Sequence, residues 1–282
     1  MRVDAHHHLW HYTPEEYSWI DDAQQVLRHD FLLADIEREA AAAGVDASVA
    51  VQARQTLEET HWLLGLAAHS KLIQGVVGWA PLSADNFPAI LAELRKNPLL
   101  RGLRHVVQGE PEGFLNAPRF NRGISALLGT GLTYDILIFP HQLPEATRFV
   151  DRHPAQFFVL DHIAKPDIRH NEFDSWNTAI RDLGRRENVT CKLSGLVTEA
   201  DWNRWTPAQL YPYFDTVLDV FGPSRLMVGS DWPVLTVASN YSEWWRIVTE
   251  WIAPLSPTER AHIEGEVATR IYQLPTQQNP ED

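Results

Sequence analysis

The stretch Asp4-Ala5-His6-His7-His8 stands at the start of the chain and continues directly into the apolar pair Leu9-Trp10. Side chains alternate along a β-strand, so His6 and His8 share one face of this segment and His7 lies on the other. Two imidazoles side by side can hold a metal ion or polarise a carbonyl oxygen. A tag remnant and a single structural histidine are simpler explanations, but a tag is usually longer and a structural histidine needs no partner. The stretch therefore predicts the end of a buried first strand that carries chemistry.

Short apolar segments recur after this strand and alternate with helical patterns. Seven further strands are predicted at 47–52, 73–79, 100–107, 132–138, 157–162, 189–195 and 225–231. Helices are predicted at 33–43, 58–69, 87–96, 119–128, 144–152, 176–186, 207–222 and 257–272, the last two opened by N-cap signals. Strands that are apolar on both faces and alternate with helices are typical of a parallel sheet covered by helices.

Eight such units in a chain of 282 residues predict an α/β fold, a (β/α)8 TIM barrel that forms a single domain over residues 1–274. A polar C-terminal tail, 275–282, follows the last predicted helix. A doubly wound sheet is the alternative architecture. No G-x-G-x-x-G motif follows the first strand, which disfavours a dinucleotide-binding domain of that kind.

The composition restricts the kinds of partner. The formal net charge of -13 disfavours nucleic acid and anionic membrane surfaces. The single cysteine, Cys191, cannot form an intrachain disulfide, which favours a reducing compartment. No apolar run has the length of a membrane span, and the first residues lack the apolar core of a signal peptide. We therefore expect a cytoplasmic protein without nucleic-acid or membrane partners, and leave homo-oligomerisation open.

Polar residues collect at the carboxyl ends of the predicted strands, where the active site of such a barrel lies. They are His6 and His8 on the first strand, Gln52 and Arg54 after the second, Arg104 and His105 on the fourth, His162 and Lys165 at the sixth, Lys192 and Ser194 on the seventh, and Asp231 and Trp232 at the eighth. A structural protein has no reason to place so many ionisable groups at one rim. The pattern predicts an enzyme.

The residue types suggest roles for the catalytic candidates. Asp231 is a carboxylate at a strand end, suited to taking a proton from water. The imidazoles of His6, His8 and His162 could hold a metal or donate hydrogen bonds to an oxyanion. Two structural alternatives stay open, an ion pair between Asp231 and Arg104 and a helix-start role for His162.

A second group of rim residues is predicted to bind substrate. Its members are Arg104, His105, Gln52, Arg54, Lys165, Ser194 and Trp232. Side chains of Arg, Lys and His at this rim could contact substrate oxygens, and tryptophans there could pack against sugar rings. The direction of Lys192, towards the barrel mouth or towards the helical layer, is not decided by the strand pattern.

These motifs resemble the amidohydrolase superfamily, with D-x-H-x-H on the first strand, a histidine after the sixth and an aspartate after the eighth. Four segments are more similar to its sugar-lactonase branch, which includes L-fuconolactonase and L-rhamnonolactonase. They are L-R-H at 103–105, L-D-H-I-A-K-P at 160–166, C-K-L-S-G-L-V-T-E-A-D-W at 191–202 and G-S-D-W-P at 229–233. The resemblance extends over almost the whole chain.

The resemblance implies hydrolysis of a sugar-acid lactone to the free aldonic acid, with L-fucono-1,5-lactone or a close aldonolactone as the best guess. In that reaction we expect Asp231, the carboxylate at the end of the last strand, to be the general base for water. The resemblance assigns polarisation of the carbonyl, directly or through one metal, to His6, His8 and His162. The expected partner is therefore a small-molecule sugar lactone.

Departures from the superfamily pattern limit the metal content. Binuclear members carry a bridging lysine or glutamate on the fourth or fifth strand and a histidine on the fifth, whereas the fifth strand here ends without one and His141 lies beyond it. We therefore expect at most one divalent ion, zinc, bound by His6, His8 and Asp231 with His162 in reach. Activity without the metal is left open.

Three other functions remain as alternatives. A pyrone or dicarboxylate lactonase would need several arginines for two carboxylates, and only Arg54 and Arg104 are available here, which favours a neutral polyol lactone. A metal-dependent decarboxylase of an aromatic acid would release carbon dioxide instead of taking up water. An inactive barrel serving as a binding protein is disfavoured by the complete set of three histidines and Asp231.

Overall fold

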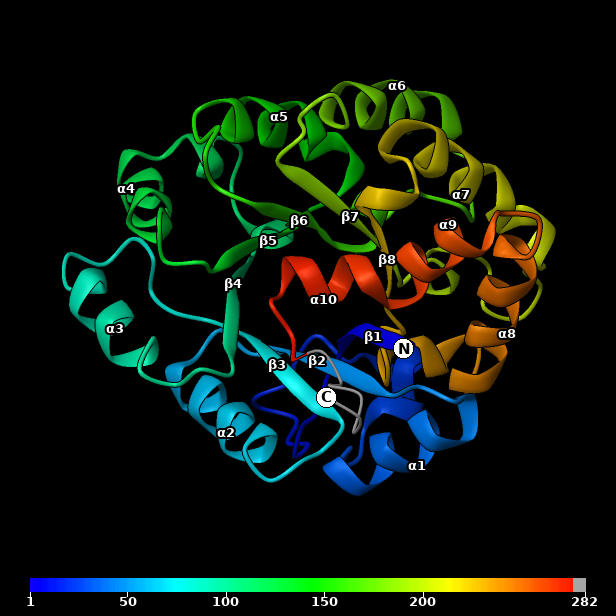
Figure 1. Cartoon of the computed structure of the whole chain (residues 1–282), viewed down its shortest axis with the longest axis horizontal. Coiled ribbons are helices and arrows are strands. Elements are labelled where there is room, and N and C mark those ends of the chain that lie inside the picture. Colours follow the sequence, from blue (N-terminus) through cyan, green and yellow to red (C-terminus); the bar gives the residue numbers. More distant parts are fainter. Residues whose placement is uncertain (276–282) are drawn as a thin grey trace, which may run out of the picture.

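The computed structural model describes residues 1–275, so the predicted tail lies outside the described residues except for Pro275. Eight parallel strands pair in chain order from β1 to β8. They are β1 (Val3–His7), β2 (Ala47–Val51), β3 (Ile73–Gly78), β4 (Leu100–Val106), β5 (Thr133–Leu137), β6 (Phe158–Leu160), β7 (Val189–Leu193) and β8 (Leu226–Val228). The strands form the inner ring in Figure 1.

An α-helix follows each strand and lies in an outer ring (Figure 1). These helices are α1 (Leu33–Ala43), α2 (Leu57–Ala67), α3 (Phe87–Leu94), α4 (Pro118–Leu127), α5 (Leu143–Asp151), α6 (Phe173–Leu183), α7 (Pro207–Phe221) and α8 (Tyr241–Ile252). The predicted (β/α)8 barrel is confirmed. Among the described residues, none of the helices has both the length and the apolar character needed to cross a membrane.

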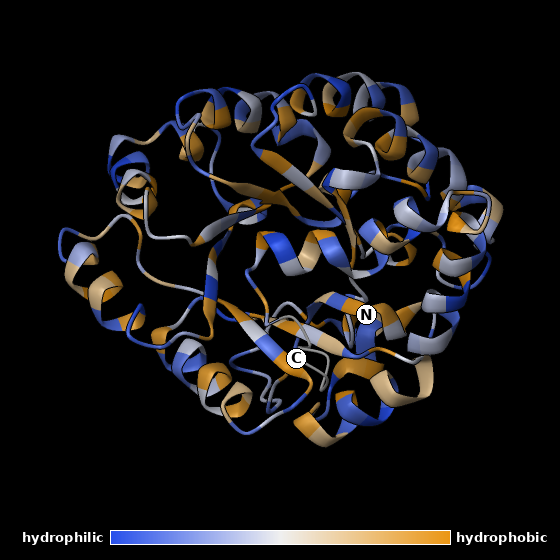
Figure 2. Ribbon diagram, viewed as in Figure 1, coloured by the Kyte–Doolittle hydropathy of each residue, from blue (hydrophilic) through white to orange (hydrophobic). Residues whose placement is uncertain are grey.

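The strands are covered on both sides, which explains their apolar sequences. Every residue of β1, β2, β5 and β7 is buried. The outer helices are amphipathic, as Figure 2 shows by the mixture of hydrophobic and hydrophilic residues along each one. In α6, for example, the buried residues Trp176, Ile180 and Leu183 are spaced four and three apart, so they lie on one helical face.

The barrel closes where the segment after β8 meets β1. The backbone N–H of Asp231 donates to the carbonyl of His6 at 2.8 Å, and the N–H of His8 donates to the carbonyl of Trp232 at 2.6 Å. The Asp4 carboxylate adds a side-chain connection, because it accepts hydrogen bonds from Oγ of Ser230 at 2.6 Å and from its N–H at 2.8 Å. Closure therefore brings Asp231, after the last strand, next to His6 and His8 on the first strand.

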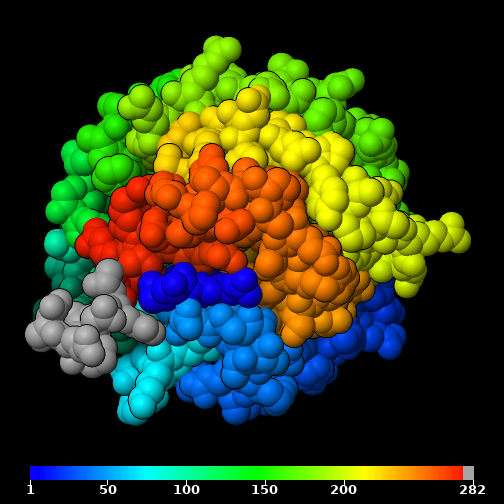
Figure 3. Space-filling model, turned by 45° about the vertical axis from the view of Figure 1, so that its right-hand side comes forward, coloured from blue at the N-terminus to red at the C-terminus, as the bar shows by residue number. Residues whose placement is uncertain are grey.

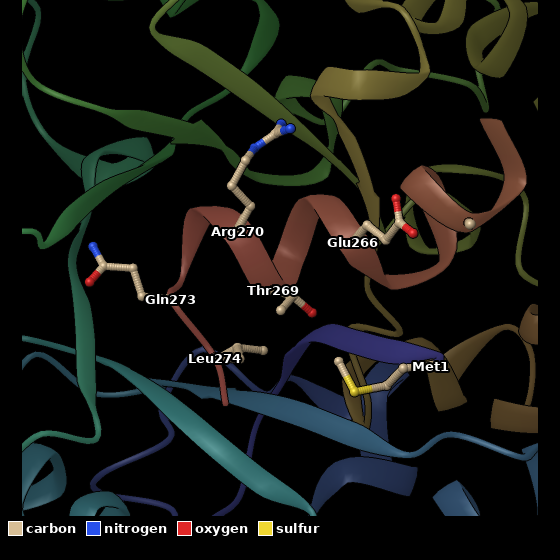
Figure 4. A pocket seen from close by; sticks show the side chains of 7 residues that line it. Met1, Glu266, Thr269, Arg270, Gln273 and Leu274 are labelled. Atoms are coloured by element: carbon tan, nitrogen blue, oxygen red, sulfur yellow. The ribbon is translucent and has the colours of Figure 1, made fainter. Parts of the chain in front are cut away.

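The C-terminal helices cover the other end of the barrel. Helix α9 (Pro257–Ala261) begins at the predicted capping box of Ser256, and a π-helical turn leads into α10 (Val267–Ile271). Figure 1 shows α10 across the middle of the strand ring, and Figure 3 shows the N-terminal residues beside these red helices. A cavity of about 570 Å³ opens next to α10 (Figure 4), lined by groups such as Met1, Thr269 and Leu274 that form no catalytic cluster.

All eight strands end one to three residues earlier than the sequence predicted, and one α-helix was not predicted. β6 ends at Leu160 and β8 at Val228, because the backbone then takes positive φ at His162 (53°) and Asp231 (59°), which a strand cannot include. Helix α8 begins after Asn240, whose side chain caps the N–H of Glu243. Both early strand ends bring a predicted catalytic side chain out of the sheet.

Candidate active site

A cavity of about 350 Å³ opens at the carboxyl ends of the strands. The ionisable side chains in its lining are His8, Arg104, His162, Lys165, Glu199 and Asp231. Trp10, Trp19 and Trp202 supply its aromatic wall. The rim predicted from the sequence thus forms one cavity, although not every predicted residue lines it.

The two histidines of the H-x-H pair lie side by side, as their spacing predicted. Nε2 of His6 and Nε2 of His8 are 3.1 Å apart. Nδ1 of His8 lies 2.8 Å from the carbonyl oxygen of Val51, which can only accept, so Nδ1 carries a proton and, in the neutral ring, Nε2 has the lone pair. His7 lies on the opposite face with Nε2 3.0 Å from Oγ of Ser48. Burial lowers the pKa of His6 well below its ordinary value, so its imidazole is neutral near neutral pH.

Asp231 faces the imidazoles from across the closed barrel. Its Oδ1 lies 3.4 Å from Nε2 of His8 and 3.8 Å from Nε2 of both His6 and His162. Burial acts to raise the pKa of Asp231, but the adjacent His162 and the Lys165 ammonium hold it well below its ordinary value. Within residues 1–275, no group donates a hydrogen bond to its Oδ2. An ionised carboxylate oxygen is therefore available for a water molecule or a ligand.

His162 is held between Ser194 and a glycine. Nδ1 of His162 lies 2.8 Å from Oγ of Ser194, and burial lowers the pKa of His162 to about 4. Gly195 has a φ of 64°, and a Cβ at this position would lie 2.7 Å from Nδ1 of His162 and 2.9 Å from Oδ2 of Asp231. The sequence analysis quoted Gly195 within a motif but gave it no role. The structure shows that both functional groups need the space that its missing side chain leaves.

Arg104 pairs with Asp161, not with Asp231. Its Nη1 lies 2.9 Å from Oδ2 of Asp161, and its Nη2 donates to the backbone carbonyl of Gln52. The structural ion pair between Arg104 and Asp231 that the sequence left open is therefore absent from the described residues. Asp161 is fully buried, and its neighbour Lys192 holds its pKa well below the ordinary value although burial acts to raise it.

Lys192 points into the barrel, which decides the direction that the strand pattern left open. Its Nζ lies 2.7 Å from Oδ2 of Asp135, 3.0 Å from Oδ1 of Asp161 and 3.2 Å from Nδ1 of His6. Asp135 was missed by the sequence analysis. The available signal was a polar pair, Thr133 and Asp135, on one face of an otherwise apolar strand, and Oγ1 of Thr133 donates to that carboxylate at 2.9 Å.

Several predicted substrate-binding residues do not line the cavity. His105 follows Arg104 in β4 and therefore points the other way, with Nε2 2.7 Å from Glu110 and its ring stacked on Phe114. Arg54 forms an ion pair with Glu16. The remaining three lie behind the lining, where they support lining residues: Gln52, Ser194 and Trp232.

The loop after β7 contributes Glu199, which the sequence analysis gave no role, and Trp202, one of the strand-end tryptophans expected to pack against sugar rings. Glu199 lies in the cavity wall with Oε1 2.7 Å from Nζ of Lys165. Trp202 lines the same wall and is held by a hydrogen bond from its Nε1 to the carbonyl of Thr198 at 2.8 Å. Both belong to the motif at 191–202, so the motif pointed to this wall without identifying the side chains.

The donor set fits a divalent metal. His6, His8 and Asp231 offer ligand atoms within 4.8 Å of one another. In the neutral ring of His8, the lone pair on Nε2 lies 3.4 Å from Oδ1 of Asp231, a contact that a cation would relieve. A second set also lies within that distance, formed by His6, Asp161 and His162, but Asp161 is already paired with two cationic side chains.

Comparisons with known proteins extend over almost the whole chain. The family model described as amidohydrolase matches residues 3–274. The chain is 40% identical to L-fucono-1,5-lactonase from Burkholderia multivorans, covering 98% of this chain and 97% of the relative. It is 34% identical to L-fucono-1,5-lactonase from Burkholderia ambifaria, covering 97% and 96%. A crystal structure of an amidohydrolase from Burkholderia multivorans with bound zinc has a TM-score of 0.93 at 41% identity, covering 98% of this chain and 100% of that chain.

Replacing Gly195 by alanine tests the packing around the catalytic groups. The new Cβ would collide with His162 and Asp231, and the positive φ adds backbone strain of about 1–3 kcal/mol. We expect a soluble Gly195→Ala variant with a lower melting temperature and a kcat reduced by about 100-fold, the size of effect that small displacements at a reacting centre can have. Gly113→Ala, at a positive φ with no atom within 4 Å of the place its Cβ would take, is the matched control for strain alone. Equal kcat values for the two variants would contradict the role of Gly195.

Proposed function

The chain belongs to the amidohydrolase family, and on that premise we propose that it hydrolyses a sugar-acid lactone, L-fucono-1,5-lactone or a close aldonolactone, to the free aldonic acid. The two lactonase relatives support the sugar lactonase that the sequence motifs predicted. The observation that carries the proposal is Asp231, an ionised carboxylate with a free Oδ2 among residues 1–275, placed beside the imidazoles of His6, His8 and His162. Such a pair of functions, a base beside polarising groups, suits addition of water to an ester carbonyl.

In the proposed reaction Asp231 accepts a proton from the water that attacks the lactone carbonyl. It then passes a proton to the ring oxygen as the acyl C–O bond breaks, so that the products are a carboxylic acid and a hydroxyl group. Because Nε2 of His8 carries a lone pair, hydrogen bonds to the developing oxyanion come from His6 and His162. A lactone is already an activated ester, so these groups have a modest barrier to lower.

The cavity suits a neutral polyol better than a dianion. Its two cationic side chains, Arg104 and Lys165, are each paired with a carboxylate of the protein at 2.9 and 2.7 Å. A dicarboxylate substrate would have to compete with Asp161 and Glu199 for them. This pairing, together with the tryptophans of the lining, favours a sugar lactone over the pyrone-dicarboxylate and aromatic-acid alternatives, which are less well supported.

We further propose one zinc ion per chain, held by His6, His8 and Asp231 with His162 beside them. When bound there, a divalent cation would supply Lewis acidity that polarises a carbonyl oxygen. The protein side chains orient the substrate and move the proton in either case. Two features motivate a single ion and its identity as zinc. They are the donor set and the missing bridging ligand on β4 and β5.

A panel of aldonolactones with a pH indicator tests the substrate. We expect acid release from L-fucono-1,5-lactone or a near stereochemical relative, since the relatives and the paired cations both favour a neutral sugar lactone. Dicarboxylate lactones and aromatic acids serve as the comparison substrates. No hydrolysis of any aldonolactone, beside turnover of one of these comparison substrates, would overturn the proposal.

Asp231→Asn keeps the side-chain shape and removes the base. We expect kcat to fall by at least about 10²–10⁴-fold, the usual contribution of general-base catalysis, with the melting temperature nearly unchanged. Because the pKa of Asp231 is depressed, its carboxylate stays ionised as the pH falls, so wild-type kcat/KM should hold from neutral pH down to about pH 5, well above the pKa of about 4 for His162. A near-normal kcat in the variant would contradict the assignment of Asp231 as the general base.

The metal content and the zinc affinity of the protein test the proposed zinc site. We expect elemental analysis to give no more than one zinc per chain, and His8→Ala to weaken zinc binding in calorimetry because a lone pair is lost from the donor set. Hydrolysis should persist after chelation, since His6 and His162 remain to stabilise the oxyanion. Two tightly held metals per chain, or complete loss of activity on chelation that zinc restores, would refute these expectations.

A further inference from the structure

The ring nitrogen of His6 that points away from the cavity contacts a cation. Nζ of Lys192 lies 3.2 Å from Nδ1 of His6 with hydrogen-bonding geometry. A histidine that binds a metal usually donates its other N–H to a carboxylate, a carbonyl or water. An ammonium group has donors only, so this contact is favourable only when Nδ1 of His6 carries a lone pair. His6 therefore has a hydrogen-bond donor beside Nδ1, whereas a histidine that binds a metal normally has an acceptor there.

We propose that Lys192 is a positioning residue that keeps the proton of His6 on Nε2, the ring nitrogen that faces His8 and Asp231. The contact between His6 and His8 agrees with this tautomer. The carbonyl of Val51 fixes the proton of His8 on Nδ1, which leaves Nε2 of His8 as an acceptor. Nε2–H of His6 can then donate to it across 3.1 Å. Both nitrogens of His6 are satisfied, one by Lys192 and one by His8.

The other tautomer of His6 makes poorer contacts. Its Nδ1–H would face the ammonium of Lys192, with Oδ1 of Asp161 as a distant acceptor at 3.4 Å. On the opposite side, two lone pairs would face each other across the 3.1 Å between His6 and His8. The one group that would gain is Nη1 of Arg104 at 3.3 Å, and it already donates to Asp161 at 2.9 Å. The short contacts therefore favour the proton on Nε2.

The position of Lys192 is fixed from the far end of the barrel. Its side chain is fully buried, and Asp135 holds Nζ at 2.7 Å. Asp135 is itself held by the hydroxyl of Tyr272 at 2.6 Å, and the ammonium lies 5.2 Å from the centre of that tyrosine ring. Tyr272 follows α10, the helix that covers the amino ends of the strands (Figure 1). A continuous series of contacts thus connects the C-terminal helix to His6.

Two consequences follow for the site. The first, which rests on the proposed function, is that His6 holds an N–H beside Asp231 and His8, and can exchange its bond to Nε2 of His8 for one to the lactone oxyanion when substrate is bound. The second does not depend on the substrate. A metal ligand needs a lone pair on Nε2, so Lys192 opposes metal binding through His6 by favouring the other tautomer. Removing Lys192 should therefore weaken catalysis and strengthen zinc binding, two changes in opposite directions.

The test compares two variants that differ at Lys192. Lys192→Met alone would leave two buried carboxylates short of a cation, so it is combined with Asp135→Asn, which removes one positive and one negative charge together. Asp135→Asn alone is the matched control, because it retains Lys192 beside His6. Two-bond ¹H–¹⁵N spectra of metal-free, histidine-labelled protein report which ring nitrogen carries the proton, and His6→Gln identifies the His6 signals. Calorimetry with Zn²⁺ and steady-state kinetics complete the set.

We expect the control to keep the His6 proton on Nε2, as in the wild type, and the double variant to lose this preference. Relative to the control, the double variant should bind Zn²⁺ about 10-fold more tightly, the range seen for groups behind a metal ligand. Its kcat should be about 10- to 100-fold lower with KM changed much less. An unchanged His6 tautomer with unchanged zinc affinity would overturn the proposal. Failure of the wild type to hydrolyse lactones would refute the proposed function while the spectra still decided the role of Lys192.

Discussion

A buried carboxylate connects the first strand of the barrel to the last. Asp4 accepts hydrogen bonds from both the hydroxyl and the N–H of Ser230, and from the hydroxyl of Tyr241 on α8 at 2.9 Å. Burial raises its pKa to about 6 despite these donors. The contact also needs close backbone approach, since a Cβ on Gly229 would lie 2.6 Å from Cβ of His6. His6 and Asp231 can face each other only because the sheet closes here.

The interior of the barrel contains charged groups where apolar side chains would be expected. Asp135, Asp161, Arg104 and Lys192 are almost completely buried and pair with one another. Replacing a buried ion pair by apolar residues of similar volume is often neutral or stabilising, so stability does not explain the set. Its position does, because both cations contact His6, at 3.2 and 3.3 Å. The network specifies the surroundings of one imidazole.

Burial and strained backbone also shape the electrostatics of the mouth. His162 and Asp231 both have positive φ, which costs free energy for residues with a Cβ. In return, both side chains leave the sheet and meet at the same cavity. The imidazoles of His6, His8 and His162 then surround the one carboxylate, and only a small Gly195 can lie behind them. These imidazoles and Lys165 hold the pKa of Asp231 low, and the imidazoles and Asp231 supply the donor set that fits a divalent metal.

Local sequence patterns were enough to predict the architecture and most of the residues that meet at the candidate active site. Period-two and helical patterns depend on neighbouring residues, so eight strand–helix units could be counted, and the carboxyl-end rule then placed His6, His8, His162 and Asp231 at one mouth. Which groups pair across the barrel became known only from the folded chain. Arg104 binds Asp161, Lys192 points inward, and His105 is excluded because it alternates with Arg104. These contacts join residues 57 to 186 positions apart, and their distances are set by strand register and barrel closure, which local patterns do not encode.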